Sequence, residues 1–238
     1  MRDVTEIWSY LAHGPLLWLA LTLAAFVAGS FLFERAGRRA WANPVLIAVA
    51  LVAAALELTG TSYATYFEGA QFVHFMLGPV TVALATPLWD NRAAVRRSLL
   101  PMAAALAAGL TAALGSVVLI GRAMGLPAGT ILSMLPKSAT APVAIGVSEG
   151  IGGSPTLTAV LVILTGIVGA VLAPPLLALL RIRDPRARGF AVGLAAHGIG
   201  TAQMMLTDAR AGAFAGIGLG VGAVTTALVA PLVAHWLF

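Results

Sequence analysis

The sequence contains no cysteine, only one lysine, and few charged residues of any kind: 10% of its 238 residues. The absence of cysteine excludes disulfides, thiolate metal sites and thiol nucleophiles. A soluble domain carries about 25% charged residues, whereas this chain is 60% hydrophobic, with a mean hydropathy of +0.96. A soluble core of this length could not bury so much apolar surface. The composition therefore predicts an integral membrane protein whose solvent is the lipid bilayer.

Uncharged runs recur along the chain, and most approach the roughly 20 residues that a helix needs to cross the hydrocarbon. None of them alternates with period two, so we expect helices, which satisfy their own backbone hydrogen bonds in lipid. We predict an all-α, polytopic helical bundle in two halves, 1–125 and 126–238. The predicted spans are about 14–34, 40–58, 69–89, 98–121, 154–180, 189–208 and 211–238, with a re-entrant segment at 126–150.

The basic residues indicate an orientation. The net charge is +5, but the arginines sit in short clusters between apolar runs, which favours membrane topology over nucleic-acid binding. The positive-inside rule places the arginine-rich loops 34–39, 90–97 and 181–188 in the cytoplasm. The N-terminus then lies outside and the C-terminus inside. Because 126–150 must cross an even number of times, we predict that it forms two half-helices in a re-entrant hairpin. We find no signal-peptide pattern and expect the first apolar run to be retained.

Two short sequence matches indicate an internal repeat. Asn43–Val49 resembles Ser154–Val160, and Gly78–Thr81 resembles Gly198–Thr201, in the same order in both halves. The arginine rule gives the two copies opposite directions. Inverted repeats with broken helices near the midplane are typical of secondary transporters. The alternative is a chance match in a chain rich in Ala, Leu and Gly.

Lys137 is the lone lysine, and it lies in an apolar segment. A lysine within the membrane is costly unless it has a partner or water, so it indicates a functional site. Pro136 suits the first turn of a helix, whose N-terminus would carry partial positive charge. Lys137, Ser138 and Thr140 would then form an anion site. The alternative is that Lys137 snorkels to the interface or pairs with Glu149.

A second group of polar residues follows in the last part of the chain. Gly198 and Gly200 can unwind a helix after His197, and a new helix can start at Thr201, with Gln203 two residues further on. His197 can also take a proton during transport. The alternative is a structural histidine bonded to a neighbouring carbonyl.

The first half offers a matching break, and two carboxylates complete the candidates. Gly78, Pro79 and Thr81 form the break, for which the alternative is a plain proline kink. Glu68 and Glu149 are candidate proton or partner sites. No spacing resembles a metal site, a catalytic triad or a phosphate loop, so we expect neither enzymatic activity nor a cofactor.

The motifs resemble those of the LrgB/CidB family of bacterial membrane proteins. They are Tyr66–Ala70, Leu77–Leu88, Leu135–Ser138, Ile151–Pro155 and His197–Ala202. The family order is kept over nearly the whole chain. There are departures: Ala139-Thr140-Ala141 follows Lys-Ser, Ala196 stands where the family often has Ser, and Gln203 where it often has Arg. Losing that arginine removes a bidentate carboxylate ligand.

The resemblance implies two kinds of function. The family was first described as holin- or antiholin-like and linked to control of murein hydrolases and cell lysis. Its plant relative is a plastid glycolate/glycerate translocator, and bacterial relatives are associated with pyruvate uptake. It also implies an inner-membrane location and a separate LrgA-like subunit, and we expect a homo-oligomer. We predict a secondary transporter of small monocarboxylate anions (glycolate, glycerate, pyruvate or lactate), with a holin-like role in lysis as the alternative. Lys137 would neutralise the carboxylate, and Ser138, Thr140, Thr201 and Gln203 would bind the hydroxyl or keto oxygen. The other predicted substrate-binding residues are those of the two breaks: Gly78, Pro79, Thr81, His197, Gly198 and Gly200.

Overall fold

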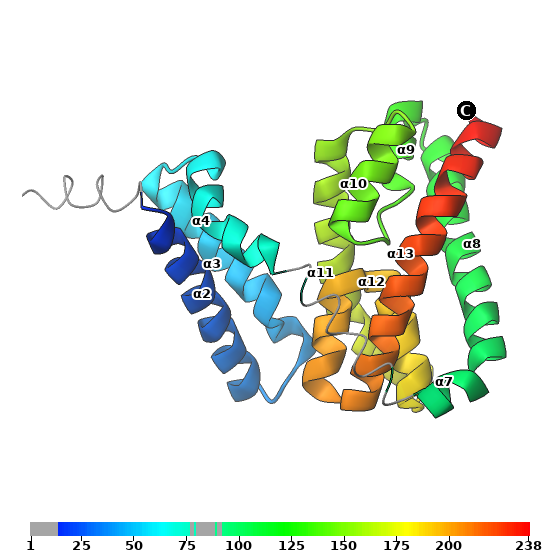
Figure 1. Cartoon of the computed structure of the whole chain (residues 1–238), viewed down its shortest axis with the longest axis horizontal. Helices are drawn as coiled ribbons and strands as arrows, with labels where there is room; N and C mark the ends of the chain where they lie inside the picture. The colour runs from blue at the N-terminus through cyan, green and yellow to red at the C-terminus, as the bar shows by residue number, and fades with distance from the viewer. Residues whose placement is uncertain (1–13, 77–78, 80–88, 90–91) are drawn as a thin grey trace, which may run out of the picture. The chain divides into compact units, whose positions relative to one another are not determined.

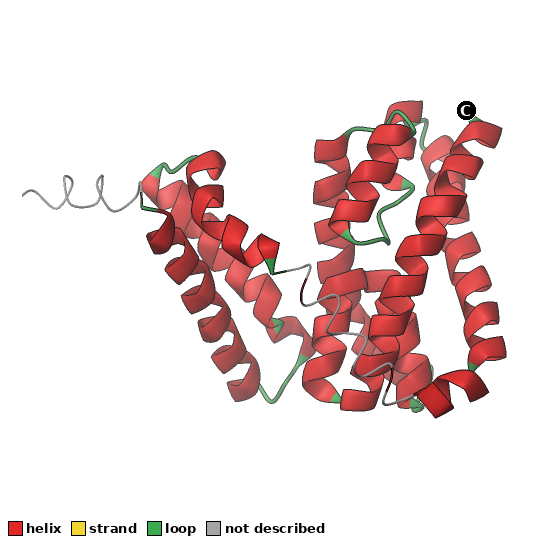
Figure 2. Ribbon diagram, viewed as in Figure 1, coloured by secondary structure: helices red, strands yellow, loops and turns green. Residues whose placement is uncertain are grey.

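The computed structural model describes residues 14–76, 79, 89 and 92–238, and helices are the only regular secondary structure in this part of the chain (Figure 2). The chain separates into two compact units, 1–85 and 86–238. Four of the described helices are long and apolar enough to cross a membrane: α2 (Pro15–Arg35), α8 (Leu99–Ala123), α11 (Pro155–Leu179) and α13 (Ala209–Leu237). The prediction of an all-α polytopic membrane protein is confirmed.

Unit 1 packs α2 against α3 (Pro44–Thr59) and α4 (Tyr63–Phe75). A short 3₁₀ turn, Ala40–Ala42, precedes α3. Gly29 allows α2 to approach α3 closely, since a Cβ there would lie 2.6 Å from the Pro44 carbonyl oxygen. Trp18 on α2 is fully buried, and its ring meets that of Tyr66 on α4 edge-on, with the centroids 6.0 Å apart.

The two segments of the predicted repeat begin helices in the same way. Asn43 caps α3 by accepting the amide N–H of Val45 at 2.9 Å, and Ser154 caps α11 by accepting that of Leu157 at 3.4 Å. A proline follows each cap at the first helical position, where its missing N–H costs nothing. The opposite direction of the two segments involves both units and stays a prediction.

Unit 2 contains two short helices where the re-entrant segment is predicted. Its helices are α7 (Arg92–Arg97), α8, α9 (Ala128–Met134), α10 (Ala141–Gly150), α11, α12 (Pro185–Thr207) and α13. At 1.5 Å per residue, α9 and α10 are about 10 and 15 Å long, well short of the roughly 30 Å hydrocarbon. They fold back on each other, and the turn between them projects toward the middle of the unit (Figure 1).

A cluster of buried hydroxyls fixes the base of this hairpin. The Thr158 hydroxyl on α11 lies 2.9 Å from the Ser133 carbonyl oxygen of α9 and 2.7 Å from the Ser148 hydroxyl of α10. The Ser133 hydroxyl accepts the amide N–H of Ser154 at 2.7 Å. Ser133, Ser148 and Thr158 are all completely buried. One threonine thus joins three helices by hydrogen bonds that lipid cannot replace.

The first half of α12 runs parallel to the start of α13. A Cβ added to Gly189 would collide with the backbone of Ala211, and one added to Gly193 would collide with that of Ala215. The numbers of the contacting residues rise together, which defines a parallel pair. The backbones approach so closely that only glycine fits, as in other membrane helix pairs.

The second half of α12 runs antiparallel to the same part of α13. Met205 packs against Gly212, while Thr201, one turn earlier, points its hydroxyl at the Ala215 carbonyl oxygen 3.4 Å away. Here one number falls as the other rises. Both halves of α12 therefore lie beside one end of α13, and α12 is a hairpin.

Contacts within α12 confirm the fold-back. A Cβ on Gly200 would lie 2.8 Å from Cγ1 of Val192, although eight residues of straight helix span about 12 Å. The reversal occurs at Ala196 (φ −119°, ψ 15°) and His197 (φ 39°, ψ −132°), which leave the helical region.

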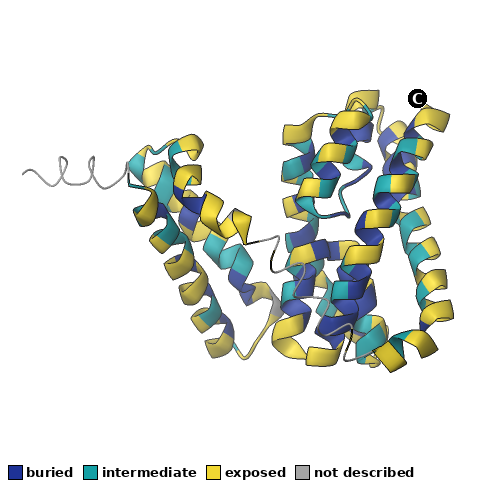
Figure 3. Ribbon diagram, viewed as in Figure 1, coloured by how far each residue is buried: buried dark blue, intermediate teal, exposed yellow. Residues whose placement is uncertain are grey.

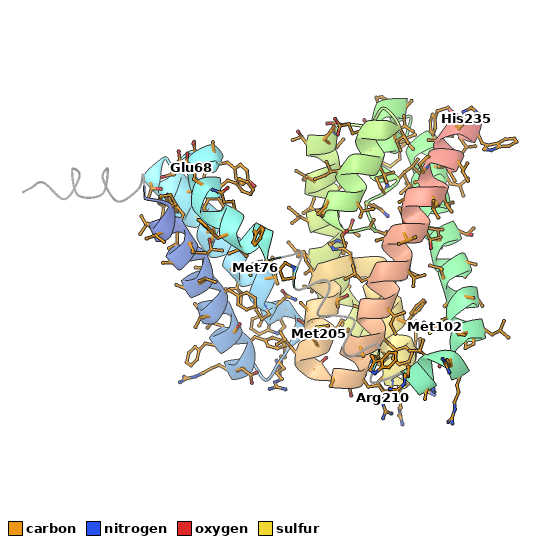
Figure 4. The ribbon with its side chains drawn as sticks, in the orientation of Figure 1. Glu68, Met76, Met102, Met205, Arg210 and His235 are labelled. Carbon is orange, nitrogen blue, oxygen red and sulfur yellow. The ribbon has the colours of Figure 1, made fainter. Side chains whose placement is uncertain are left out.

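This hairpin corrects the prediction that 189–208 is a span. Both ends of α12 lie at the same end of unit 2, so the segment does not cross. The apolar run misled the prediction because a buried re-entrant hairpin is as apolar as a span. With α12 folded back, α13 carries the C-terminus to the end of unit 2 opposite the 181–188 loop. Figure 4 shows Arg210 and His235 at opposite ends of the unit.

Unit 2 therefore contains two copies of the same arrangement, a spanning helix followed by a hairpin, and the two copies run in opposite directions. α8 is followed by the α9–α10 hairpin, and α11 by the α12 hairpin. The two hairpins enter from opposite ends of the unit. Buried residues concentrate where α12 and α13 meet, whereas α8 is largely exposed (Figure 3). This is the arrangement that positions the candidate site.

Candidate functional site

The tips of the two hairpins meet the middle of α11. Val162 packs with Ala139 and Ala144 of the first hairpin. Its carbonyl oxygen accepts a hydrogen bond from Nε2–H of His197, in the second hairpin, at 2.8 Å. Two segments about 60 residues apart in the sequence thus come together on one helix turn. Broken backbone at membrane depth is tolerated only where protein or a water-filled cavity covers it.

A cavity of about 480 Å³ lies beside these tips. Its polar lining consists of the Lys137 side chain and three hydroxyl residues, Ser138, Thr165 and Thr226. The remaining lining residues are apolar: Ala105, Gly109, Leu110, Ala112, Ala113, Phe190, Ala191, Leu194 and Ala195. An apolar cavity with a few convergent polar groups is the usual form of a small-molecule site.

Lys137 is half-buried and faces this cavity. Among the described residues, no carboxylate lies within ion-pair distance of it. Glu149, the alternative partner, is exposed near the end of α10. A cation in an apolar cavity without a protein counter-ion favours a bound anion.

The helix near Lys137 does not begin where it was predicted. α9 ends at Met134, and Pro136–Ala139 form a turn in which the Ala139 N–H donates to the Pro136 carbonyl at 2.9 Å. α10 begins only at Ala141, with Thr140 as its N-cap residue. Pro136 therefore shapes the turn and does not start the helix. The positive charge beside the cavity comes from the Lys137 ammonium.

His197 is buried, 4% exposed, and its ring points at α11 and not into the cavity. The hydrogen bond to the Val162 carbonyl is the structural role that we weighed as the alternative. The break in α12 lies at Ala196 and His197, just before the predicted glycines, and the new helical half begins near Gly198 instead of Thr201. Thr201 donates its hydroxyl to the His197 carbonyl at 2.7 Å.

The other predicted residues of this motif lie beside the tip but do not line the cavity. Gly200 and Gln203 are buried within the α12 hairpin, and Gly198 is exposed. The residues from α12 that do line it precede the break, at Phe190–Ala195. Thr140 also lies outside the lining, at the start of α10.

The remaining predicted site residues, apart from Glu149, lie in unit 1, and some of them fall outside the described residues. Glu68 is exposed on α4. Gly78 and Thr81 lie outside the described residues, and Pro79 is described without its neighbours. Within unit 2, the described residues show no ion pair between Glu149 and Lys137, and Glu68 belongs to the other unit. In the described part of the chain, no His, Asp and Glu side chains group as a metal site would require.

Four positions of the candidate site were not predicted from the sequence. Thr165 and Thr226 line the cavity, and Gly166 and Gly169 on α11 make room for the second tip. A Cβ on Gly166 would lie 2.6 Å from Cε1 of His197, and one on Gly169 would lie 2.5 Å from Cβ of Ala196. The available signal was the five-residue segment Thr165–Gly169, in which one threonine and two glycines interrupt a long apolar run.

Comparison with known proteins identifies relatives over most of the chain. Residues 22–236 match the LrgB-like family. The chain is 34% identical over 220 residues to the Bacillus subtilis protein YxaC, covering 92% of this chain and 95% of YxaC. It is 32% identical over 218 residues to the antiholin-like protein LrgB of the same species, covering 92% and 94%. It is 34% identical over 190 residues to the holin-like protein CidB of Staphylococcus aureus, covering 80% and 83%. No solved structure matches the chain significantly.

Proposed function

The chain belongs to the LrgB-like family of membrane proteins, and on this premise we propose that it is a secondary transporter of small monocarboxylates such as glycolate, glycerate, pyruvate or lactate. The observation that carries the proposal is Lys137, the only lysine, facing a cavity beside two opposed hairpin tips. In secondary transporters, substrate sites lie at such breaks near the midplane.

The cavity suits a small hydroxy- or keto-acid. The Lys137 ammonium neutralises the carboxylate. Ser138, Thr165 and Thr226 offer hydroxyls to the second oxygen of the substrate, and the alanine-rich wall accepts its short carbon chain. A volume of about 480 Å³ falls within the range of about 300–1,000 Å³ that ligand sites occupy, and leaves room for water.

The predicted Gln203 contact is replaced in this proposal. Gln203 lies in the hairpin interior and not in the cavity lining. Thr165 and Thr226, which do line it, take the role that we first gave to Thr140, Thr201 and Gln203. The departure of Gln203 from the family pattern then bears on the stability of the α12 hairpin, and less on the choice of anion.

Uptake of labelled glycolate into proteoliposomes tests this function. Replacing Lys137 with Met keeps the length and removes the charge, and we expect uptake to fall about tenfold or more, the effect of losing a hydrogen bond to a charged group. Arg210→Gln is the matched control, because it removes an exposed cation that does not line the cavity. Equal uptake by parent and Lys137→Met would remove the proposed site.

A holin- or antiholin-like role is the second candidate, and the names of the relatives LrgB and CidB favour it over transport. Such a pore would need a wide wet path. Release of a trapped dye from liposomes, without saturable glycolate uptake, would decide for this candidate. Saturable uptake with the dye retained would decide for transport.

We also propose an orientation. In unit 2 the loop arginines and Arg210 lie at one end, where α7, both ends of α12 and the start of α13 meet. By the positive-inside rule this end faces the cytoplasm. The C-terminus then faces outward, the reverse of our prediction from the sequence. Alkaline phosphatase fused after Phe238 should be active in a bacterial host, while green fluorescent protein at the same place should be dark.

Assembly remains a prediction. An LrgA-like subunit and a homo-oligomer are both expected from the family resemblance. Co-expression with such a subunit, followed by purification through a tag on this chain and mass measurement in native conditions, tests both at once.

A further inference from the structure

A second cavity adjoins the one that holds Lys137. It also measures about 480 Å³ and lies toward the arginine-rich end of unit 2. Its lining comes from the start of α8, Leu177 near the end of α11, the loop before α12, the start of α12 and Phe214 of α13. We call it the vestibule, lined by Ser98, Pro101, Met102, Ala105, Leu177, Ile182, Asp184, Arg186, Ala187, Phe190, Ala191 and Phe214.

The vestibule and the Lys137 cavity share one wall. Ala105, Phe190 and Ala191 line both of them. Two of the three shared residues are alanines, so Phe190 is the one large side chain in this shared wall. Phe190 is buried, 4% exposed, in a cluster with Phe214 and Ile217, and Met102 and Leu106 of α8 pack against that cluster.

The mouth of the vestibule is polar and charged. Asp184 and Arg186 lie in its lining, with Arg186 donating to the Asp184 carboxylate at 2.6 Å. Both side chains are partly exposed. The arginines of the 181–188 loop surround this end, and clustered positive charge raises the local concentration of anions.

The opposite direction shares less wall with the Lys137 cavity. A third cavity, of about 470 Å³, follows α8 toward Arg122 but shares only Leu110 with the Lys137 cavity. Leu110 is packed against the cluster of Leu114, Val117 and Ile131. The Lys137 cavity therefore has one lining residue in common with this third cavity and three in common with the vestibule.

We propose that the Lys137 cavity is reached from the arginine-rich end of unit 2 through the vestibule, and that Phe190 is the side chain that closes the passage. Rotation of the Phe190 ring, which shares this wall with Ala105 and Ala191, joins the two cavities. α8 is the helix that moves to make room for the ring, since it is largely exposed. The passage is a property of the fold and does not depend on which anion is carried.

Because the chain has no cysteine, single introduced thiols report access directly. Ser138→Cys places a thiol in the cavity, and Arg183→Cys places one on the exposed arginine-rich surface as a marker of side. Inside-out and right-side-out membrane vesicles are treated with an anionic, membrane-impermeant thiosulfonate. We expect both variants to label in the same vesicles. Equal or faster labelling of Ser138→Cys in the opposite vesicles would overturn the passage.

Three changes in the Ser138→Cys background test the closing residue. Phe190→Ala should speed labelling by about tenfold or more, the factor of a modestly lowered barrier. Ala105→Trp, at an exposed position of the shared wall, should slow labelling by a similar factor without disturbing a core. Ala104→Trp is the matched control, because Ala104 is also exposed but lines neither cavity.

The two tryptophan variants keep the test decisive if Phe190→Ala fails to fold. Identical labelling rates for Ala105→Trp and Ala104→Trp would show that the wall shared by the two cavities, with Phe190, does not control access to Ser138→Cys. Glycolate uptake is measured separately, on vesicles that contain the parent chain with Ser138 intact. Labelling that follows the proposal while uptake is absent would leave the passage standing and reject the transport function.

Discussion

Replacing Gly166 with alanine tests how the second hairpin tip is held against α11. The added Cβ would lie 2.6 Å from Cε1 and 2.8 Å from Nε2 of His197, closer than such atoms approach one another. The ring must move away. Moving it also strains the hydrogen bond of 2.8 Å from Nε2–H to the Val162 carbonyl.

The size of the effect follows from these two contacts. Inserting one methyl into a packed interior costs about 1–3 kcal/mol, and a lost hydrogen bond adds about 0.5–1.5 kcal/mol. We therefore expect the free energy of unfolding to fall by roughly 2–4 kcal/mol. At about 2–4 °C for each kcal/mol in a chain of this length, the midpoint should fall by about 5–15 °C.

Purified variants heated in detergent and passed over a size-exclusion column provide the measurement. Gly220→Ala in α13 is the matched control, because its Cβ would meet nothing within 4 Å. It should be neutral or stabilising by about 0.5–1 kcal/mol, since alanine favours helix over glycine.

A double mutant separates the clash from a general effect of the methyl. His197→Ala removes the ring, so the new methyl in Gly166→Ala can occupy vacated space. The double variant should be more stable than the sum of the two single effects by about 1–3 kcal/mol. Strict additivity, or a Gly166→Ala midpoint equal to that of Gly220→Ala, would refute the packing of His197 against Gly166.

Three further predictions concern hydrogen bonds, charge and close packing in unit 2. Thr158→Val should lower stability by about 1–3 kcal/mol because it leaves buried polar groups unpaired, whereas Thr225→Val, at an exposed site, should change it little. Hydrogen bonds from Arg186 hold the pKa of Asp184 at about 2, so its stabilising contribution should be complete above about pH 4 and be lost as the pH falls through about 2. Gly193→Ala should prevent stable folding, because its Cβ would collide with backbone.

Each of these has an outcome that would contradict it. Thr158→Val and Thr225→Val with the same thermal midpoint would show that the hydroxyl cluster does not secure the first hairpin. An Asp184→Ala variant whose midpoint falls as steeply as that of the parent between about pH 4 and 2 would exclude this carboxylate as the source of the acid sensitivity. A well-folded Gly193→Ala protein would rule out the close parallel contact of α12 with α13.

The first hairpin was predictable, and the second was not, for a definite reason. The segment 126–150 contains prolines, Lys137 and Glu149, and the arginine loops around it require an even number of crossings. The α12 segment, in contrast, carries an apolar run that is long enough to span the membrane. Its fold-back depends on glycines that touch α13, a contact between residues about 22 positions apart that no local pattern reveals.

The candidate site divides in the same way. The sequence identified Lys137, because a lone cation in an apolar chain stands out, and it marked the break near His197 through the neighbouring glycines. It could not show that the His197 ring turns to the Val162 carbonyl, away from the cavity. Nor could it select Thr165 and Thr226 from other threonines in apolar helices.

By itself the sequence determined the lipid environment, the helical class, the family and the charged residue of the candidate site, Lys137. Composition and short motifs are enough to indicate each of these. Only the tertiary structure decided which apolar segments cross and which turn back, and which hydroxyl residues line the same cavity as Lys137. The cause is physical: in lipid, a span and a buried hairpin need the same apolar residues, and packing between distant helices distinguishes them.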